Sequence, residues 1–242
     1  MPKSKYNDIY ISIKKLIEDN VYKNQDLLPS ENNLIKEYNC SRNTVRRAIS
    51  HLTNDGYVQP IKGKGVRVIY SKNNSLSFSL GGIETFQEST KRNKRKARTR
   101  VILFEEQIVN SALSKITGFR ISETVFHIQK VRYIDNIPLI LDNNYFLKSI
   151  MPELTKEKAE NSIYNYLEKD LGVTIVTSKR QITVGHATDQ DQKYLDLKDY
   201  NCVAIVTNQA YNKDGILFEY TESKHSPDYF SFHNVAIRGN VL

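Results

Sequence analysis

Cysteine is scarce in this sequence, and tryptophan is absent. The 242 residues contain two cysteines, Cys40 and Cys202, with no Cys-x-x-Cys pair and no histidine at metal-ligand spacing around them. Disulfide frameworks and zinc-binding motifs both need several cysteines or histidines at regular spacing. The sequence therefore implies neither, and we expect neither a metal nor a cofactor.

Long apolar runs and the common catalytic motifs are also missing. No apolar run approaches the roughly 20 residues that cross a bilayer, and the opening residues MPKSKYNDIY lack the apolar region of a signal peptide. The five histidines are scattered, and there is neither a Gly-x-Ser-x-Gly elbow nor a P-loop. We expect a cytoplasmic protein with no membrane partner that is not an enzyme.

Positive charge is concentrated in the first part of the chain. Residues 1–72 hold 13 Lys and Arg against 7 Asp and Glu, residues 73–100 hold 7 against 2, and the remainder holds 15 against 18. The first hundred residues therefore carry a net charge of +11, whereas the rest carries −3. Such a separation is typical of proteins that bind a polyanion through one region.

Residues 28–65 predict two helices followed by a two-stranded ribbon. Ser41 is a good N-cap for the second helix, and Gly56 is a good C-cap. Between them the apolar residues recur at i, i+3, i+4 and i+7 and form one buried stripe: Val45, Ala48, Ile49 and Leu52. With an amphipathic helix expected at residues 5–20, the pattern predicts a winged helix-turn-helix domain over residues 1–70.

Candidate DNA contacts lie on the polar side of the second helix and at the turn of the ribbon. They are Arg42, Asn43, Arg46 and Arg47 on the helix and Lys62 and Lys64 at the turn. A recognition helix inserts its N-terminal half into the major groove, where arginine forks onto guanine or clamps a phosphate. The alternative is that these arginines only solvate an exposed helix. The lysines of the Lys-Gly-Lys-Gly turn favour DNA binding, because glycine lets the backbone approach phosphate closely.

These motifs resemble the GntR family of bacterial transcription regulators. The family signature runs from Leu-Pro-Ser-Glu through Ser-Arg-x-Thr-Val-Arg to Gly-Tyr and a Gly-rich wing, and this chain has matching tracts at residues 28–31, 41–46, 56–57 and 62–65. The resemblance adds Thr44 and Gly63 to the contacts. It also implies double-stranded operator DNA as a partner and a homodimer on a pseudo-palindromic site. Many relatives have arginine where this chain has Asn32.

Beyond residue 70 the composition changes. Residues 71–79, SKNNSLSFS, have the composition of a linker, and we place the second domain at residues 80–242. Its pattern predicts an α+β fold with an antiparallel sheet. Strands are expected at residues 101–109, 124–134, 138–146, 173–184, 202–212 and 217–225, and helices at 111–116, 161–171 and 189–195. The basic run at residues 91–100 is expected to be a solvated loop, with an arm that follows DNA phosphates as the alternative.

The second domain resembles the UTRA effector domain of the HutC branch of GntR regulators, whose fold is similar to that of chorismate lyase. The tracts SIYNYLEKDLG and FEYTESKH are especially similar to trehalose-operon repressors of Gram-positive bacteria. This resemblance implies a pocket for a sugar phosphate, such as trehalose 6-phosphate, that releases a repressor from its operator. Alternatives are a regulator that responds to another ligand, such as an amino-sugar phosphate, and an enzyme of chorismate lyase-like fold.

The same resemblance implies eight effector-binding residues. They are Thr85 and Phe86 at the start of a helix, Lys130 and Arg132 on a strand, Ser162 and Tyr164 in a Ser-x-Tyr tract, and Glu219 and His225 near the sugar. Residues two apart on a strand project to one side, and a carboxylate accepts hydrogen bonds from sugar hydroxyls. The relatives' two arginines are here Lys130 and Arg132, and their Tyr-Arg-Gly-Asp turn is replaced at residues 225–228 by His-Ser-Pro-Asp. Each residue also has a simpler alternative. Lys130 and Arg132 could be solvent-facing strand residues, and Tyr164 could belong to the helix core. Glu219 could pair with Lys224 or another surface cation, and His225 could be a structural histidine.

Overall fold

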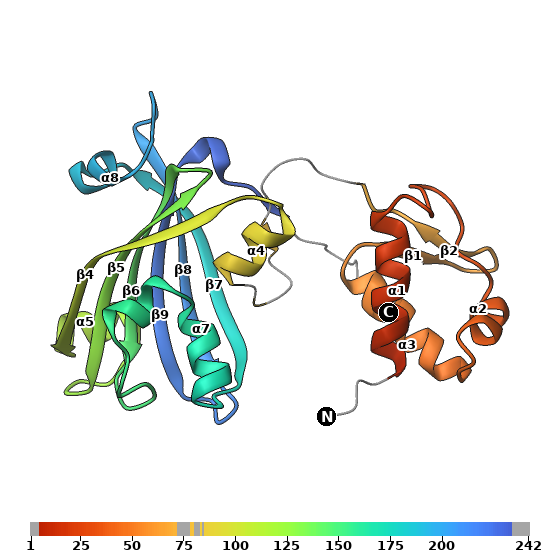
Figure 1. Ribbon diagram of the computed structural model, residues 1–242, viewed down its shortest axis with the longest axis horizontal. Helices are drawn as coiled ribbons and strands as arrows, with labels where there is room; N and C mark the ends of the chain where they lie inside the picture. Colours follow the sequence, from red (N-terminus) through yellow and green to blue (C-terminus); the bar gives the residue numbers. More distant parts are fainter. Residues whose placement is uncertain (1–4, 72–77, 80–82, 84, 234–242) are drawn as a thin grey trace. The chain divides into compact units, whose positions relative to one another are not determined.

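The computed structural model describes residues 5–71, 78–79, 83 and 85–233 (Figure 1). These residues divide into two compact units, the first within residues 1–74 together with residue 233, and the second within residues 75–232. Each unit has a hydrophobic core of its own. Of the linker expected at residues 71–79, residues 72–77 lie outside the described residues. No helix in the described part of the chain combines the length and apolar character needed to cross a membrane.

Three helices and a two-stranded ribbon form the first unit. They are α1 (Lys5–Glu18), α2 (Glu31–Glu37), α3 (Arg42–Asn54), β1 (Val58–Ile61) and β2 (Gly65–Val68). The side-chain oxygens of Ser30 and Ser41 each accept a hydrogen bond from the backbone N–H group three residues on, so these serines begin α2 and α3. The expected apolar stripe of α3 is buried against α1.

The wing depends on glycine. β1 and β2 pair antiparallel, with Val58 opposite Val68. Between them Gly63 has φ +75° and Gly65 has φ +110°. Side chains with a Cβ rarely adopt these angles, so the ribbon turns tightly here because both positions are glycine.

A six-stranded antiparallel sheet dominates the second unit, in the order β4-β5-β6-β9-β8-β7. The strands are β4 (Ala97–Ile108), β5 (Thr124–Ile134), β6 (Ile137–Leu147), β7 (Ile175–His186), β8 (Cys202–Asn212) and β9 (Leu217–His225). The short strands β3 (Phe78–Ser79) and β10 (Phe232–His233) pair separately. The expected linker therefore ends in a strand.

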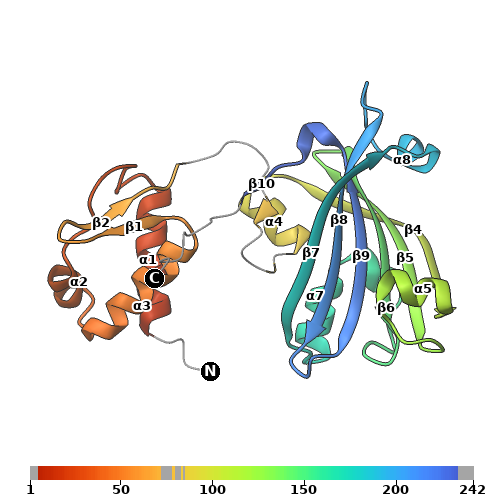
Figure 2. The same cartoon turned by 180° about the vertical axis from the view of Figure 1, so that it is seen from behind.

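Short helices cover parts of this sheet. They are α4 (Phe86–Arg92), α5 (Ser111–Thr117), α6 (Lys156–Glu160), α7 (Ile163–Asn165), the π-helical turn η1 (Tyr166–Asp170), α8 (Asp189–Tyr194) and the 3-10 turn η2 (Pro227–Tyr229). Figures 1 and 2 show α5 and α8 near opposite ends of the strands. Gln209 of β8 donates a hydrogen bond of 2.9 Å to the Thr117 carbonyl and ties α5 to the sheet.

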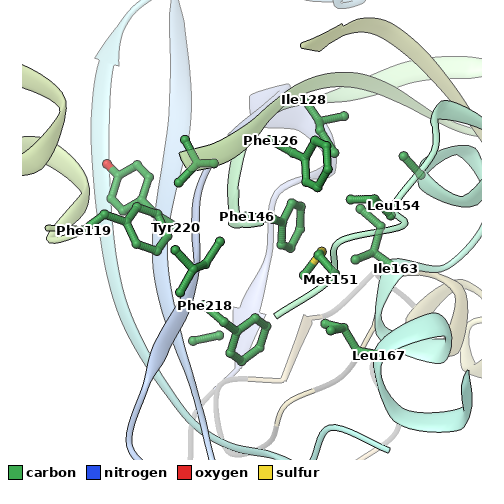
Figure 3. Close-up of a cluster of buried hydrophobic side chains, with 14 of the residues drawn as sticks. Phe119, Phe126, Ile128, Phe146, Met151, Leu154, Ile163, Leu167, Phe218 and Tyr220 are labelled. Atoms are coloured by element: carbon green, nitrogen blue, oxygen red, sulfur yellow. The ribbon is translucent and has the colours of Figure 1, made fainter. Parts of the chain in front are cut away.

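The larger core lies between the sheet and the segment that carries α6 and α7 (Figure 3). Phe126, Phe146 and Phe218 from the strands face Met151 and Leu167, and all five side chains are almost fully buried. Burying a side chain of this size contributes about 1.5–3 kcal/mol. This packing fixes the helical segment against the strands and so positions the residues at its start.

The structure confirms most of the expected elements and corrects two. The strands expected at residues 124–134, 202–212 and 217–225 have the predicted bounds. The single helix expected at residues 161–171 is wrong, because a short α-turn passes into the wider π-turn, in which Leu171 N–H bonds to the Tyr166 carbonyl at 3.1 Å. The solvated loop expected at residues 91–100 is shorter than predicted, because residues 91–92 end α4 and residues 97–100 already belong to β4, the strand into which it leads.

Candidate functional site

A cavity of about 190 Å³ lies in the second unit, between one face of the sheet and the starts of α4 and α7. All eight effector residues expected from the sequence line it: Thr85, Phe86, Lys130, Arg132, Ser162, Tyr164, Glu219 and His225. They come from segments up to 140 residues apart in the sequence. The fold thus brings together the whole expected set around one space.

Strand alternation explains how the polar side chains converge. Lys130 and Arg132 are two apart on β5, and Lys130 lies opposite Asp142 of β6. On β9 every second residue lines the cavity: Glu219, Thr221, Ser223 and His225. Side chains two apart on a strand share a face, so one face of the sheet becomes polar. The polar alternation of β9 is a signal from which Thr221 and Ser223 could have been found.

The cationic side of the cavity contains Lys130 and Arg132. Lys130 is only 4% exposed, and among the described residues no group lies within hydrogen-bond or ion-pair distance of its Nζ. Burial, together with the nearby Arg132, lowers the pKa of Lys130 from 10.5 to about 8, against the opposing effect of Asp142 and Glu219. Among the described residues, the N–H donors of this ammonium group are therefore open to a ligand that enters the cavity.

Arg132 differs from Lys130 because it has a partner. Its Nε donates to Oδ2 of Asp142, and its guanidinium group lies 4.7 Å from the centre of the Phe86 ring. Ser223 Oγ donates to the other oxygen of Asp142 at 2.6 Å. Burial opposes ionisation of Asp142, but Arg132, Lys130 and these hydrogen bonds outweigh it and lower the pKa of this carboxyl.

The acidic part of the cavity is built on Glu219, whose charge acts on Lys130. Tyr164 donates a hydrogen bond of 2.6 Å to one oxygen of Glu219, and Thr221 donates one of 2.7 Å to the other. Burial raises the pKa of Glu219, although these donors and Lys130 oppose the rise. Burial and the Glu219 charge together raise the pKa of Tyr164. The alternative Glu219–Lys224 pair is wrong, because Lys224 instead bonds Asp191 at 3.1 Å.

His225 is neutral at physiological pH. Burial lowers its pKa from 6.5 to about 4, a value that includes an opposing effect of Asp142 and a smaller lowering by Arg132. A neutral imidazole has one donor and one acceptor nitrogen. His225 therefore lines the cavity without adding charge to it.

The hydroxyl groups of Thr85 and Ser162 cap the helices that enter the cavity. Thr85 Oγ accepts a bond from the Glu88 N–H at 3.1 Å, and Ser162 Oγ accepts one from the Asn165 N–H at 3.2 Å. Each hydroxyl can still donate its own hydrogen to a ligand. The backbone N–H of Thr85, however, already donates to the Glu88 carboxylate at 2.8 Å.

On the first unit, the candidate DNA contacts are held by α2. Arg46 and Arg42 are 66% and 59% exposed, and Arg46 Nε bonds Glu31 at 2.7 Å. Arg42 donates to the amide oxygen of Asn32 at 3.3 Å. The sequence analysis did not identify these holding contacts, which join residues 10 and 15 positions apart in the sequence.

The remaining candidates on the first unit fall into two places. Asn43 and Thr44 lie at the exposed or half-buried start of α3, while Lys62, Gly63 and Lys64 are exposed in the β1–β2 turn. Arg47 is separate from them, because its guanidinium group stacks 3.9 Å above the ring of Tyr6 on α1. Arg42 and Arg46 are therefore the arginines that α2 holds at the start of the recognition helix.

The two units together have the architecture of a transcription regulator that carries its own ligand-binding domain. The chain belongs to the GntR family of bacterial regulatory proteins, whose domain matches residues 5–68, and residues 92–231 match the UTRA domain.

The similarity to individual relatives extends over the whole chain. The HTH-type transcriptional regulator TreR of Bacillus subtilis (strain 168) is 35% identical over 239 residues, which cover 99% of this chain and 100% of TreR. The solved effector-binding domain of the B. subtilis trehalose repressor TreR is 36% identical, with a TM-score of 0.54, and covers 59% of this chain and 99% of that domain. The possible regulator YydK of B. subtilis shares the fold at 23% identity, with a TM-score of 0.81 over 97% of this chain and 100% of YydK.

Proposed function

We propose that this regulator is a repressor of a sugar-utilisation operon whose cavity binds a sugar phosphate, with trehalose 6-phosphate as the first candidate. The observation that carries the proposal is the buried Lys130 ammonium group beside Arg132. Two cations on one strand face attract a phosphate, and Lys130 has donors to offer it. The similarity to a protein named as the trehalose repressor supports the choice of sugar.

The phosphate group occupies the cationic side of the cavity in this proposal. Lys130 supplies an unpaired ammonium group, and Arg132 turns its remaining N–H donors toward the ligand while Asp142 holds its Nε. The Thr85 and Ser162 hydroxyls donate from the two helix starts. A phosphate at this position replaces the solvation that burial has removed from Lys130.

The sugar occupies the acidic side of the cavity. Glu219 accepts hydrogen bonds from sugar hydroxyls, and the uncharged His225 ring borders the sugar. The Tyr164 and Thr221 donors hold the Glu219 carboxylate in a fixed orientation. An amino-sugar phosphate is the second candidate, because its ammonium group would form an ion pair with the same carboxylate.

Operator recognition belongs to the first unit. Arg42, Asn43, Thr44, Arg46 and Arg47 of α3 and Lys62, Gly63 and Lys64 of the wing contact double-stranded DNA, and a homodimer places two such units on a pseudo-palindrome. The effector must bind the DNA-incompetent state more tightly than the competent one. A coupling free energy of about 1–3 kcal/mol would then weaken operator affinity roughly 5–150-fold.

The test is a gel shift with DNA from the region upstream of the protein's own gene. The complex is titrated separately with trehalose 6-phosphate, free trehalose and glucosamine 6-phosphate. Release by trehalose 6-phosphate but not by trehalose is the expected result. Release by glucosamine 6-phosphate alone would replace the sugar, and binding without release by any of the three would overturn the effector proposal.

A further inference from the structure

The basic segment, residues 91–100, is the strongest concentration of charge in the chain. It has seven Lys and Arg residues and no Asp or Glu, whereas residues 101–242 carry a net charge of −3. Neither the recognition helix nor the effector cavity contains any residue of this segment. Its positive charge therefore has no role in the function proposed above.

Among the described residues, most cations of the basic segment have no carboxylate within ion-pair distance. Arg95 bonds Asp135 at 2.6 Å. Within the described part of the chain, no carboxylate lies within ion-pair distance of Lys91, Lys94, Lys96, Arg98 or Arg100. Elsewhere in the same unit, Lys148, Lys198 and Lys224 each pair with a carboxylate. The fold thus pairs several cations of this unit with carboxylates, whereas these five cations of the basic segment have no such pair among the described residues.

The basic segment is nevertheless held in a defined conformation. The Arg95 N–H bonds the Thr90 carbonyl at 2.9 Å, and Asp135 of the β5–β6 turn accepts a 3.0 Å bond from the Lys96 N–H. The Asp135 N–H in turn donates to the Lys96 carbonyl at 2.9 Å. A segment bound at three backbone positions presents its charges at fixed places, which a freely solvated loop does not.

The cationic side chains of the basic segment are exposed to solvent. Arg98 and Arg100 are two apart on β4 and therefore share one side of the strand. The Arg98 guanidinium group lies over the Tyr133 ring, 4.1 Å from its centre, and the residue is exposed. Lys91, Lys94 and Lys96 are exposed. A fixed, exposed row of unpaired cations is complementary to a chain of phosphates.

We propose that the basic segment is a second DNA-contacting surface, which binds the phosphate backbone of duplex DNA without reading sequence. This inference rests on the proposed DNA binding of the first unit. Because both units belong to one chain, DNA bound by α3 raises the effective phosphate concentration around the second unit. The segment adds affinity and salt dependence, while α3 and the wing supply the choice of sequence.

The salt dependence of DNA affinity distinguishes a basic segment that contacts phosphates from one that only faces water. Each phosphate contact contributes about 0.9 to the slope of log affinity against log salt. The test variant carries Lys91→Gln, Lys94→Gln and Lys96→Gln in the full-length protein. The matched control carries Lys115→Gln, Lys156→Gln and Lys213→Gln, which removes the same charge from exposed lysines elsewhere in the same unit. Fluorescence anisotropy gives the affinity for operator and unrelated duplexes between 50 and 200 mM KCl.

The expected result is a slope about 2–3 units smaller for the test variant, so that its affinity changes up to ~40-fold less across this salt range. Its preference for operator over unrelated DNA stays at the wild-type value, and the control keeps the wild-type slope. An unchanged slope in the test variant, or an equal loss in the control, would overturn the proposal. If the wild type shows no operator preference, the proposed recognition fails, but the slope on unrelated duplex still tests the segment.

Discussion

Two arginine–carboxylate pairs occupy opposite environments in this protein. Arg46 bonds Glu31 on the surface of the first unit, with side-chain exposures of 66% and 34%. Arg132 bonds Asp142 beside the effector cavity, with exposures of 21% and 2%. Water screens the first pair, so it contributes about 0–1 kcal/mol and releases its arginine easily. Burial makes the second pair costly to break, so Arg132 stays in place whether or not a ligand is bound.

The largest expected effect follows from removing the buried carboxylate. Asp142→Ala leaves Arg132 and Lys130 close together without their shared counter-charge, and we expect a loss of about 3–5 kcal/mol in the free energy of unfolding. Urea unfolding followed by circular dichroism measures it. Ser223→Ala removes only a hydrogen bond to the same carboxylate and serves as the milder comparison, at about 1 kcal/mol. Equal stability of Asp142→Ala and wild type would contradict the buried-pair description.

Lys130 is the buried cation of the cavity that has no ion pair among the described residues, so its replacement tests ligand binding. Lys130→Met keeps the length of the side chain and removes the ammonium group. We expect effector affinity to fall by about 1.5–3 kcal/mol, roughly 10–150-fold, with unchanged or higher stability. Isothermal calorimetry and thermal unfolding measure the two quantities, with Lys115→Met as the exposed control. Wild-type affinity in Lys130→Met would remove Lys130 from the phosphate site.

The lowered pKa of Lys130 also predicts a pH dependence. Between its folded pKa of about 8 and its ordinary value of 10.5, the folded state holds fewer protons than the unfolded state, so this group adds stability as pH rises through that range. The ammonium form binds phosphate, so effector affinity should fall as pH rises above about 8. Calorimetry from pH 7 to 9.5 checks both the decline and its absence in Lys130→Met.

Removing the exposed Arg46 side chain should weaken DNA binding and leave stability and effector affinity unchanged. Arg46→Ala is expected to cost about 1–3 kcal/mol of operator affinity and to relax sequence preference. Stability should stay within ~0.5 kcal/mol of wild type, because the pair with Glu31 is exposed. Gel shifts on operator and scrambled duplexes measure the first effect, and sugar-phosphate affinity provides the control. Unchanged operator binding would show that the proposed recognition face is wrong.

The smallest expected effect concerns Glu31. Glu31→Gln keeps a hydrogen-bond acceptor for Arg46 but removes the negative charge that competes with DNA. We expect tighter binding to unrelated DNA, a salt slope larger by about 1, and a smaller preference for the operator. Anisotropy titrations on both duplexes separate these outcomes. If the affinities for operator and for unrelated DNA rise by the same factor, Glu31 only repels DNA through its charge and does not orient Arg46.

Much of this fold could be predicted from local sequence. The stripe on α3, the N-cap serines and the wing glycines act within a few residues, so the first unit was predicted almost element by element. In the second unit the hydrophobic alternation gave β5, β8 and β9 their observed bounds. The segment of α7 and η1 was predicted less well, because adjacent Tyr166 and Leu167 both face the core and the backbone widens into a π-turn.

The candidate site was predicted only in part. The eight effector residues were expected from motif resemblance, and the cavity contains all of them. Thr221 and Ser223 were missed, although the polar alternation of β9 signals them. Asp142 was not expected, because a single polar residue inside a hydrophobic strand gives no local sign of what it faces. The Glu31–Arg46 and Asn32–Arg42 contacts were missed for the same reason, since each joins two helices.

The sequence by itself determined the family, the two-part organisation, the recognition helix and the position of most strands, because periodicity, capping and turn residues act over short distances. Only the tertiary structure decided that Lys130 is buried with no hydrogen-bond or ion-pair partner among the described residues, that Arg132 is held by Asp142, and that the basic segment is fixed by Asp135. Those properties depend on which strands become neighbours and on how much water they exclude. Burial and long-range pairing set the charge states of the cavity, and no single stretch of the chain contains that information.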